Sequence, residues 1–398
     1  MASLERFRAT CYSRDGIDPD AVIAPPYDVI DTAERAVLAA RSPYNSVHVE
    51  LPEAPAGASV DAYEHAALLL RKWHRQGVVA TAPVPGLAVY RMTYRDEHGA
   101  RRSTTGVLGA LGLDPDRRGD VLPHEQTIPK DRRDRLSLLR ATRANLSPIW
   151  GLSLAAGLGE LCASAAASPD PWRAVDDEGV VHERFAVREA DVEAICALVA
   201  SAPVLIADGH HRYETACAYL EESPGTKGSD AVLAYVVELS PPELSVRAIH
   251  RLVRGVERGA FEGGLDRWFA SRPGPQDAQM LPAAMEEAGG LGLVTRDGTA
   301  VLVPRAELVA SAEDDLDSSR LALVLSDLGV TDVGYQHGVD KVVDAVARGR
   351  ADAGVLLRPV SVEQIAATAH GRGRMPPKTT FFAPKPRTGM VFRELDFV

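Results

Sequence analysis

Five consecutive residues have the types and spacing that best suit a catalytic or binding role: Asp208, Gly209, His210, His211 and Arg212. The short apolar run before them predicts a buried strand, and the segment after them has the pattern of a helix. The strand would bring the carboxylate to its carboxyl end, and the glycine permits a turn that a Cβ would hinder. The histidines and the arginine then occupy the first helical turn. Four functional side chains within five residues exceed what a helix cap needs.

This turn predicts an anion site. Backbone N–H groups in the first turn of a helix lack intrahelical partners, and Arg212 can add a bidentate contact to a phosphate. A simpler alternative is that Asp208 caps the helix and the histidines are polar surface. Another is a transition metal held by His210 and His211, but adjacent helical residues point about 100° apart, which makes joint chelation awkward. Magnesium carried in with a nucleotide suits the turn better, since it keeps waters and phosphate oxygens as ligands.

A second polar stretch, at 123–132, predicts an irregular loop that leads into a helix. Its His124-Glu125 pair lacks the second histidine of the His-Glu-x-x-His zinc motif, so that class of metalloprotease is excluded. Glu125 can instead serve as a general base, with His124, Lys130 and Arg132 near the anionic end of a ligand. The alternative is a solvated loop followed by a capped helix.

Lysine is rare in this chain, and Lys378 is followed by two threonines, a sequence similar to phosphate-binding loops. No glycine-rich loop precedes it, and the chain contains no P-loop. The glycines Gly106, Gly109 and Gly112 are spaced by threes and do not form a Rossmann fingerprint, and the Gly-x-Ser-x-Gly elbow of α/β-hydrolases is missing. Those enzyme classes are therefore unsupported, while Lys378 stays a candidate for a phosphate contact.

The length and composition of the chain limit the remaining classes of function and location. A length of 398 residues exceeds what one core usually serves and predicts two or three domains. The formal net charge of −11 argues against a protein that coats duplex nucleic acid. No apolar run approaches the ~18 residues of a membrane span, and the charged N-terminus does not fit a signal peptide. The four cysteines form no Cys-x-x-Cys pair. We therefore expect a cytoplasmic protein with free thiols and with neither nucleic acid nor membrane as a partner.

The hydrophobic pattern places these stretches on a series of elements. We expect helices over 61–76, 131–144, 191–200 and 211–222, and strands over 87–94, 105–113, 204–207, 232–239 and 248–253. Strands alternating with helices favour an α/β domain, and two prolines predict a loop over 23–30.

A change in composition sets a domain boundary near residue 255. Residues 1–255 are then an α/β domain that carries both polar stretches, and residues 256–398 are a smaller α+β domain. In the second domain we expect a hairpin over 291–304, helices over 316–328, 340–347 and 362–370, and a strand over 355–357.

Four separated motifs resemble the signatures of a bacterial and archaeal family, domain-of-unknown-function family 1015. They are Ala-Pro-Pro-Tyr-Asp-Val at 24–29, Pro-His-Glu-Gln-Thr at 123–127, Ala-Asp-Gly-His-His-Arg-Tyr-Glu-Thr-Ala at 207–216 and Met-Pro-Pro-Lys-Thr-Thr-Phe-Phe-Ala-Pro-Lys at 375–385. The third motif alone is also similar to the ParB/sulfiredoxin superfamily, whose members include free-serine kinases. That resemblance implies a ParB/sulfiredoxin-like nucleotide-binding core within a mixed α/β protein. The catalytic cysteine of sulfiredoxin has no counterpart, since histidine occupies its place.

The resemblance and the residues together predict a phosphotransferase that uses ATP or ADP, with Mg²⁺ carried by the nucleotide, and acts on the hydroxyl of a small metabolite such as serine. Asp208, Glu125 and His210 are the catalytic candidates, and either carboxylate can accept the hydroxyl proton. The candidate nucleotide ligands are Gly209, His210, His211, Arg212, Thr215 and Lys378. The candidate substrate ligands are Tyr27, Asp28, His124, Thr127, Lys130 and Arg132.

Two other functions stay open. The turn can bind a nucleotide without turnover, in a regulatory module of ParB-like type in which the second domain changes partners. A nuclease is disfavoured by the acidic charge and by the lack of a surface that interleaves basic and aromatic residues. A homodimer is compatible with the sequence, and neither the acceptor nor the base of the nucleotide can be read from it.

Overall fold

The structure is a computed structural model of the chain, and it describes residues 2–55, 57, 59–96, 99–116, 118–123, 129–166, 170–312, 314–371, 375–376 and 378–397. At residues 123, 129–132, 370 and 397 it describes the backbone alone. The chain divides into two compact units, one of Met1–Ser245 with Pro384–Val398 and one of Val246–Ala383. Each unit has its own sheet and its own hydrophobic core.

This division corrects the boundary expected near residue 255. The first unit ends at Ser245, and the C-terminal segment, which the sequence prediction gave to the second domain, returns to the first unit. There β21 (Phe392–Glu394) pairs with β2 (Ala9–Tyr12) and β7 (Ala144–Asn145). Backbone hydrogen bonds to strands far away in sequence hold this segment, and a local change in composition cannot reveal them.

The main sheet of the first unit is mixed, with parallel and antiparallel pairs. Within the described residues it has nine strands: the order is β6 (Val121–Pro123), β11 (Val204–Asp208), β8 (Ile149–Ser153), β12 (Ala231–Glu238), β5 (Arg101–Gly112), β4 (Ala88–Arg95), β10 (Val181–Ala186) and β9 (Trp172–Val175), with β1 (Leu4–Glu5) beside β5. Every residue of β12 except Glu238 is buried. Continuous burial on both faces is typical of a central strand with layers on each side.

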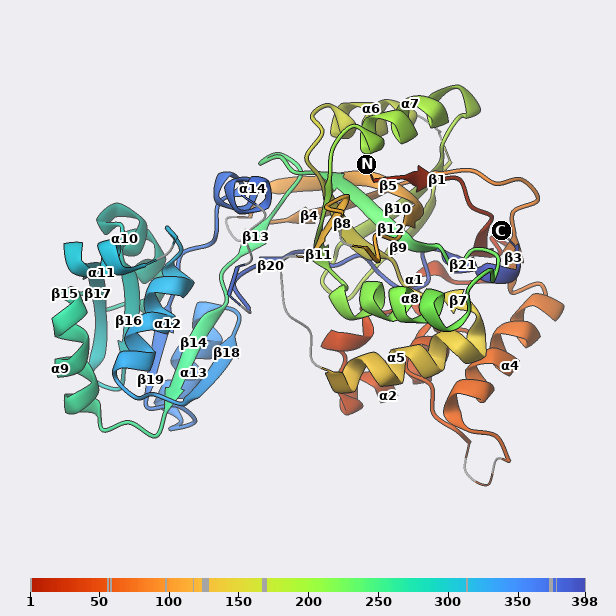
Figure 1. Cartoon of the computed structure of the whole chain (residues 1–398). Helices are drawn as coiled ribbons and strands as arrows, with labels where there is room; N and C mark the ends of the chain where they lie inside the picture. The colour runs from red at the N-terminus through yellow and green to blue at the C-terminus, as the bar shows by residue number, and fades with distance from the viewer. Residues whose placement is uncertain are drawn as a thin grey trace. The chain divides into compact units, whose positions relative to one another are not determined.

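Helices cover both faces of this sheet (Figure 1). On one face lie α6 (Leu158–Ala165) and α7 (Glu189–Ala200), and on the other lie α5 (Pro129–Thr142) and α8 (His210–Glu222). Ala218 and Tyr219 of α8 pack against Leu136 and Leu139 of α5. The remaining elements of this unit are α1 (Pro19–Val22), η1 (Tyr27–Val29), α2 (Thr32–Arg41), α3 (Val47–Glu50), α4 (Ala62–Arg75), β3 (Val79–Thr81), which pairs with β2, and η3 (Leu395–Phe397).

The helix α4 begins and ends close to the expected bounds of 61–76. Asp61 caps α4 by accepting a hydrogen bond from the Glu64 backbone N–H at 2.8 Å. The face of α4 that carries Leu70 and Trp73 is buried, as the expected spacing requires.

The second unit is built on an antiparallel sheet. Within the described residues its order is β15 (Phe269–Pro273), β17 (Gly298–Pro304), β16 (Leu291–Thr295), β19 (Ala353–Leu356), β14 (His250–Arg254) and β18 (Asp332–Gln336). A separate pair joins β13 (Val246–Arg247) to β20 (Phe381–Phe382). The helices are α9 (Arg258–Trp268), η2 (Ala278–Met280), α10 (Leu281–Ala288), α11 (Ala306–Ser311), α12 (Asp317–Asp327), α13 (Val339–Ala347) and α14 (Val362–His370). One core cluster contains residues of α9 and α12, and another contains residues of α10 and α13.

The fold confirms a mixed α/β protein with a smaller second unit. The expected helices and strands occur with shifts of a few residues at their ends, except in the loop over 23–30, where Tyr27–Val29 forms the short helix η1. Pro26 precedes it at φ −59°, a value compatible with entry into a turn.

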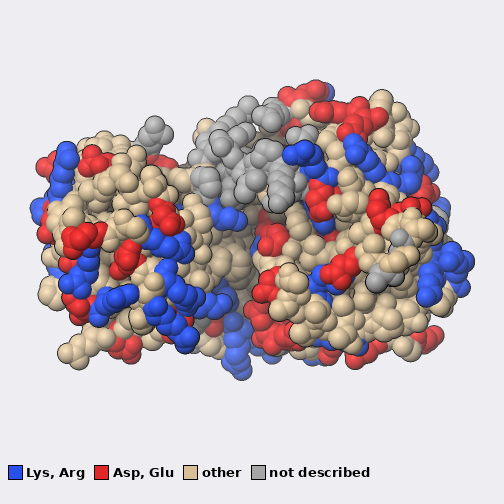
Figure 2. Space-filling view, turned by 90° about the horizontal axis from the view of Figure 1, so that it is seen from below, with Lys and Arg blue, Asp and Glu red and all other residues tan. Residues whose placement is uncertain are grey.

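Two further features concern membrane crossing and surface charge. Among the described residues, no helix combines the length and the apolar character that a bilayer crossing requires. Figure 2 shows acidic and basic side chains interspersed over the visible face of each unit.

Candidate functional site

A bulge and a glycine build the turn between β11 and α8. β11 pairs with β8 in regular register up to Ile206, and the register shifts before Asp208. Such an irregularity re-aims the side chain that follows it. Gly209 comes next with a φ of 90°, and a Cβ at this residue would lie 3.0 Å from the guanidinium of Arg212. The turn therefore requires glycine for its backbone conformation and for its space.

The start of α8 is electrostatically open to an anion. Gly209 offers no side-chain cap, and the first turn contains no acidic residue. First-turn N–H groups lack intrahelical acceptors, and the helix dipole adds a partial positive charge at this end. A negative ligand would be stabilised here.

Asp208 is the centre of a group of buried charges. Its Oδ1 lies 2.5 Å from Lys385 Nζ, and its Oδ2 lies 2.8 Å from Arg212 Nη2. Burial alone would raise the pKa of this carboxyl, but the charges of Lys385 and Arg212 outweigh it and hold the pKa well below its usual range. For Lys385 burial acts in the opposite direction and lowers the pKa, but the charges of Asp208 and Asp28 raise it by more. Asp208 is therefore ionised at neutral pH, with both oxygens engaged.

Lys385 reaches Asp208 from the C-terminal segment. An isolated β-bridge pairs Ala24 with Thr388, with N···O distances of 3.1 and 2.9 Å. The bridge aligns the segment of Lys385 with the loop of Asp28, whose Oδ2 accepts a hydrogen bond from Lys385 Nζ at 3.0 Å. One ammonium thus joins a carboxylate of the N-terminal loop to the carboxylate at the end of β11.

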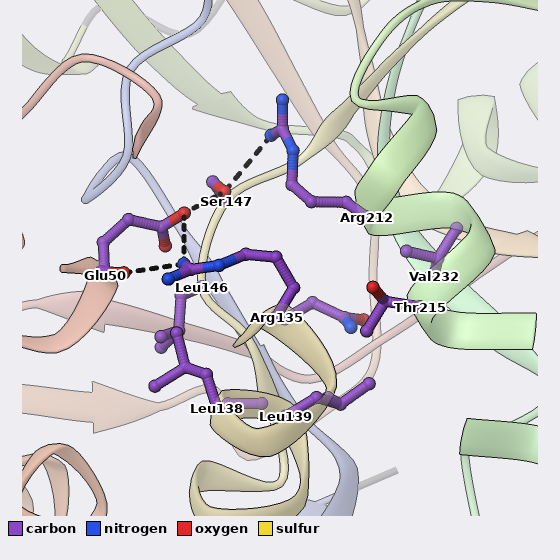
Figure 3. Close-up of a pocket in the computed structure, with 11 residues that line it drawn as sticks. Glu50, Arg135, Leu138, Leu139, Leu146, Ser147, Arg212, Thr215 and Val232 are labelled. Carbon is purple, nitrogen blue, oxygen red and sulfur yellow. Dashed lines mark hydrogen bonds and ion pairs between the residues drawn. The ribbon is translucent and has the colours of Figure 1, made fainter. Parts of the chain in front are cut away.

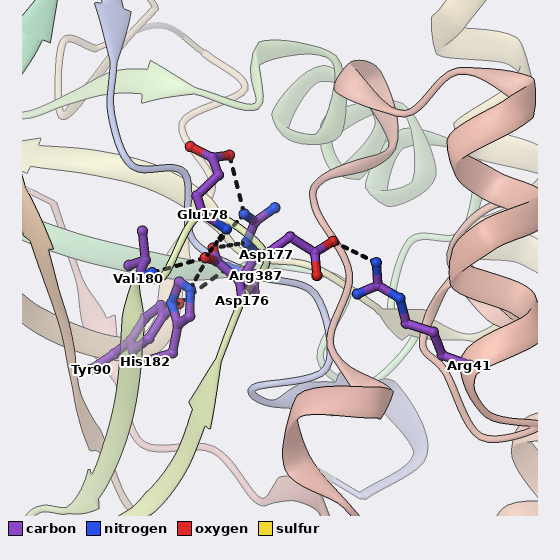
Figure 4. Close-up of polar contacts among 8 residues, drawn as sticks. All are labelled: Arg41, Tyr90, Asp176, Asp177, Glu178, Val180, His182 and Arg387. Carbon is purple, nitrogen blue, oxygen red and sulfur yellow. Dashed lines mark hydrogen bonds and ion pairs between the residues drawn. The ribbon is translucent and has the colours of Figure 1, made fainter.

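A buried cluster holds the chain two residues beyond Lys385 (Figure 4). Arg387 Nε donates to Asp176 Oδ2 at 2.8 Å, and Arg387 Nη2 contacts the same oxygen. His182 Nε2 lies 3.0 Å from this oxygen, and His182 Nδ1 lies 2.7 Å from the Tyr90 hydroxyl. That hydroxyl accepts a hydrogen bond from the Arg387 backbone N–H at 3.1 Å. The closed ring of contacts fixes both the side chain and the backbone of Arg387.

The charges in this cluster match its contacts. Burial alone would raise the pKa of Asp176, but His182 and Arg387 outweigh it and hold the pKa well below its usual range. Burial lowers the pKa of His182 even though Asp176 opposes this effect. His182 is therefore neutral at pH 7 and serves as a hydrogen-bonded spacer between Asp176 and Tyr90.

Arg212 also reaches a second buried group through its other terminal nitrogen, Nη1 (Figure 3). Its Nη1 donates to Ser147 Oγ at 3.2 Å, and Ser147 Oγ donates to Glu50 Oε1 at 2.9 Å. Arg135 Nη1 donates to the carbonyl oxygen of Glu50 at 2.7 Å and lies 3.9 Å from Glu50 Oε1. Two arginines, one from α5 and one from α8, thus approach one buried glutamate.

These residues line a cavity of about 50 Å³. Thr215 lines the cavity as well. Two of the lining residues carry a buried polar atom without a hydrogen-bond partner among the described residues, namely Arg212 Nε and Thr215 Oγ1. The Tyr27 ring packs on the guanidinium of Arg135, 4.2 Å from its carbon, and burial raises the pKa of Tyr27 to about 12. A cavity of this size, with a few polar atoms in a mainly apolar wall, suits a water molecule or one small polar group of a ligand.

The structure brings some of the predicted site residues together. Asp208 and Arg212 are in contact, Asp28 meets them through Lys385, and Thr215 shares a cavity with Arg212. On the first turn of α8, His210 is buried and His211 is partly exposed.

The remaining predicted residues belong to the second unit, to the first turn of α5 or to a stretch outside the described residues. Lys378 belongs to the second unit, where it has a positive φ of 56°. Lys130 and Arg132 lie on the first turn of α5, and only their backbone is described. His124, Glu125 and Thr127 lie outside the described residues.

Sequence reasoning missed four residues of the site: Lys385, Glu50, Ser147 and Arg135. Lys385 carried a usable signal, because it lies between two prolines in a chain that otherwise favours arginine. The other three carried none, since each depends on a partner from another part of the chain.

This arrangement limits the chemistry of Asp208. A carboxylate with a strongly lowered pKa is a weak proton acceptor, and both of its oxygens already face cations. Its contacts suit a counter-ion that orients Lys385 and Arg212. Among the described residues, no three His, Cys, Asp or Glu side chains gather closely enough to hold a metal ion.

The fold and this cluster describe a mixed α/β protein with a charged turn at the end of a strand, and comparison gives its family. The chain belongs to the family described as Protein of unknown function (DUF1015), whose sequence pattern matches residues 4–323. This confirms the membership predicted from the motifs. A comparison with curated proteins found no match.

Solved structures of other proteins resemble the chain at low sequence identity. A free serine kinase in complex with AMP is 13% identical, with 72% of this chain and 92% of that chain covered and a TM-score of 0.40. A conserved hypothetical protein from Pyrococcus furiosus is 12% identical, with 73% and 97% covered and a TM-score of 0.39. SbnI from Staphylococcus aureus, with a C-terminal truncation, is 14% identical, with 71% and 85% covered and a TM-score of 0.39. Similarity at this level says nothing of activity.

Proposed function

We propose that the protein is a phosphotransferase that moves a phosphoryl group from ATP or ADP to the hydroxyl of a small metabolite, such as the amino acid serine. The observation that carries the proposal is the pair of buried cations, Lys385 and Arg212, fixed on Asp208 beside the start of α8. Phosphoryl transfer depends mainly on positioning and on neutralising charge, and this pair at a helix N-terminus supplies both.

The turn after β11 would hold the phosphates of the nucleotide. Backbone N–H groups of the first turn of α8 would donate to phosphate oxygens, and His210, His211 and Arg212 would add contacts from the same turn. Asp208 and Asp28 would keep Lys385 charged and oriented toward them. Magnesium would enter with the nucleotide and screen the phosphate charge.

In the transfer step the acceptor hydroxyl oxygen forms a bond to the terminal phosphorus, and the bond from that phosphorus to the bridging oxygen breaks. The hydroxyl proton goes to a carboxylate, and the shortened nucleotide leaves with the bridging oxygen. Asp208 suits this proton poorly because its pKa is held low. Glu125, from the second polar stretch of the sequence, is the better candidate for the base.

The test is a direct search for product. Purified protein is incubated with ATP or ADP, magnesium and a mixture of amino acids, and the reaction is followed by phosphorus NMR. We expect a new phosphomonoester resonance from the wild-type protein and none from Glu125→Gln. The matched control is Lys227→Met, an exposed lysine of the same unit that should leave the product unchanged.

The alternative, a nucleotide-binding regulatory module, predicts a different result in the same experiment. Tight nucleotide binding without any new phosphomonoester, over a panel that also contains hydroxylated acids and sugars, would favour a nucleotide-binding switch and would remove the kinase proposal.

A further inference from the structure

The second unit contains a buried arginine, Arg251, that no carboxylate neutralises within the part of the chain that the structure describes. Arg251 on β14 is only 6% exposed. Its Nη1 donates to the Ile249 carbonyl oxygen at 2.6 Å, and its guanidinium lies 4.8 Å from the centre of the Tyr335 ring. Within the described residues no acidic side chain pairs with it. Buried charges are usually paired, because an isolated one loses its hydration without compensation.

Two other arginines of this unit, the buried Arg320 and the partly buried Arg358, show what ordinary pairing looks like. Arg320 contacts the carboxylate of Asp315, and Arg358 Nη2 lies 2.7 Å from Asp317 Oδ1. Arg251 differs from both. Burial lowers the pKa of Arg251, and among the described residues Tyr335 opposes this effect.

Buried arginines can also be satisfied by neutral groups, and Arg393 of the first unit is an example. Its two terminal nitrogens donate to the Asn145 side chain, to the Ala231 carbonyl and to the Gly228 carbonyl at 2.8 to 3.0 Å. Arg251 has one such carbonyl. Among the described residues no acceptor contacts the edge formed by its Nε and Nη2, so this edge can take an acceptor from a ligand.

Arg251 lines a pocket of about 340 Å³ between α12 and the strands β14 and β18. Four residues that carry hydroxyl groups, Ser318, Ser326, Thr331 and Tyr335, line the same pocket, and the rest of its wall is mainly apolar. None of the residues that line it is acidic. This volume is at the lower end of the range for small organic ligands.

We propose that this pocket binds a small monocarboxylic acid, with its carboxylate on the free edge of Arg251 and its apolar body against α12. Two parallel N–H groups match the two oxygens of a carboxylate, and one anion neutralises one guanidinium. The site is independent of the transfer reaction proposed above, since all its residues belong to Val246–Ala383.

The test uses the full chain with 3-methylbutanoate as the probe and 3-methylbutanamide as its uncharged match. Calorimetric titration of the wild-type protein should show binding of the acid and no measurable binding of the amide. In Arg251→Met the dissociation constant should rise about tenfold or more, because the charged contact is lost. The control is Arg254→Met, an exposed arginine of the same strand paired with Asp332, and it should bind as the wild type does.

Without the acid, Arg251→Met should melt at the same temperature as the wild-type protein or higher, since it removes an uncompensated buried charge. If Arg251→Met does not fold, Ser326→Trp takes its place in the binding test. The tryptophan fills the exposed rim of the pocket and leaves Arg251 in place, so binding of the acid should be lost. Equal binding of acid and amide, or unchanged binding of the acid in the variant that folds, would overturn the proposal.

Discussion

The cation site at Asp208 in the first unit and the site of Arg251 in the second unit differ in how the positive charge is balanced. In the first unit, Lys385 lies between two carboxylates and Arg212 pairs with one of them. In the second unit, Arg251 has a carbonyl oxygen and an aromatic ring but no carboxylate among the described residues. A cation held by carboxylates is a fixed part of the fold, and a ligand must add to an existing network. A cation without one leaves charge for a ligand to neutralise.

The largest expected effect comes from Lys385→Met. It leaves Asp208 and Asp28 without their shared ammonium, and breaking a buried ion pair of this kind costs about 4 kcal/mol. Urea unfolding of the full chain measures this loss. Lys227→Met, on the surface of the same unit, should change the free energy of unfolding by less than about 0.5 kcal/mol.

Asp208→Asn distinguishes the network from a simple pair. The amide keeps the shape but removes the negative charge, so the fold should survive with a loss smaller than that of Lys385→Met. Nucleotide affinity should fall because Lys385 and Arg212 lose their common anchor. Unchanged affinity would show that the two cations do not depend on Asp208 for their position.

The next effect tests whether the cluster around Arg387 positions Lys385. Arg387→Met should destabilise the protein by about 3 kcal/mol, because Asp176 stays buried without its partner. A positioning role also requires a kinetic signature that mere destabilisation would not give. The KM for the nucleotide should rise more than kcat falls, at a temperature where the variant is fully folded. If the melting temperature falls and the KM does not move, the cluster only stabilises the C-terminal segment.

Acid should weaken the two units over different pH ranges. The carboxyls of Asp176 and Asp208 have folded pKa values below their unfolded ones, so their contribution is present above about pH 4 and is lost below it. His250 of the second unit has its pKa lowered by burial to about 4, so it is neutral when folded. Its contribution is full above about pH 6.5, the unfolded value, and declines as the pH falls from there to about 4.

His250→Gln should therefore flatten the pH dependence of the second unit. Between pH 6.5 and 4 the wild-type unit should lose about 2 to 3 kcal/mol from this group. Protonation would also cost the hydrogen bond that His250 Nδ1 accepts from the Leu357 backbone N–H at 3.2 Å. Hydrogen exchange of the β14 and β19 amides, corrected for intrinsic rates, measures the effect. Parallel slopes in the variant and the wild-type protein would contradict it.

The sequence predicted those parts of the fold that depend on neighbours along the chain. The spacing of Leu70 and Trp73 defines α4, and the apolar run before Asp208 defines β11, because helices and strands expose these patterns locally. The helix α6, rich in alanine and glycine, showed no such pattern. The return of the C-terminal segment depends on pairing between β21 and β2, and no local signal records it.

The same distinction holds for the site. The five residues from Asp208 to Arg212 are adjacent, so their shared role was visible, and the start of α8 follows directly from them. Lys385 reaches the site through the β-bridge between Ala24 and Thr388. Glu50 reaches it from α3. The lysine on Asp208 is Lys385, while Lys378 of the second unit stays a predicted phosphate contact. Long-range pairing determined which lysine it was.

The smallest expected effect probes the cavity beside Arg212. Thr215 is 3% exposed, and its hydroxyl has no partner among the described residues. Thr215→Val replaces this hydroxyl by a methyl of similar size. Because the hydroxyl has no partner among the described residues, the substitution should lower the free energy of unfolding by less than about 1 kcal/mol, or raise it. A loss of nucleotide or acceptor affinity with unchanged stability would instead mean that a ligand supplies the missing partner. Thr215→Ser keeps the hydroxyl and separates the two results, because it should retain ligand affinity and lose only the packing of one methyl.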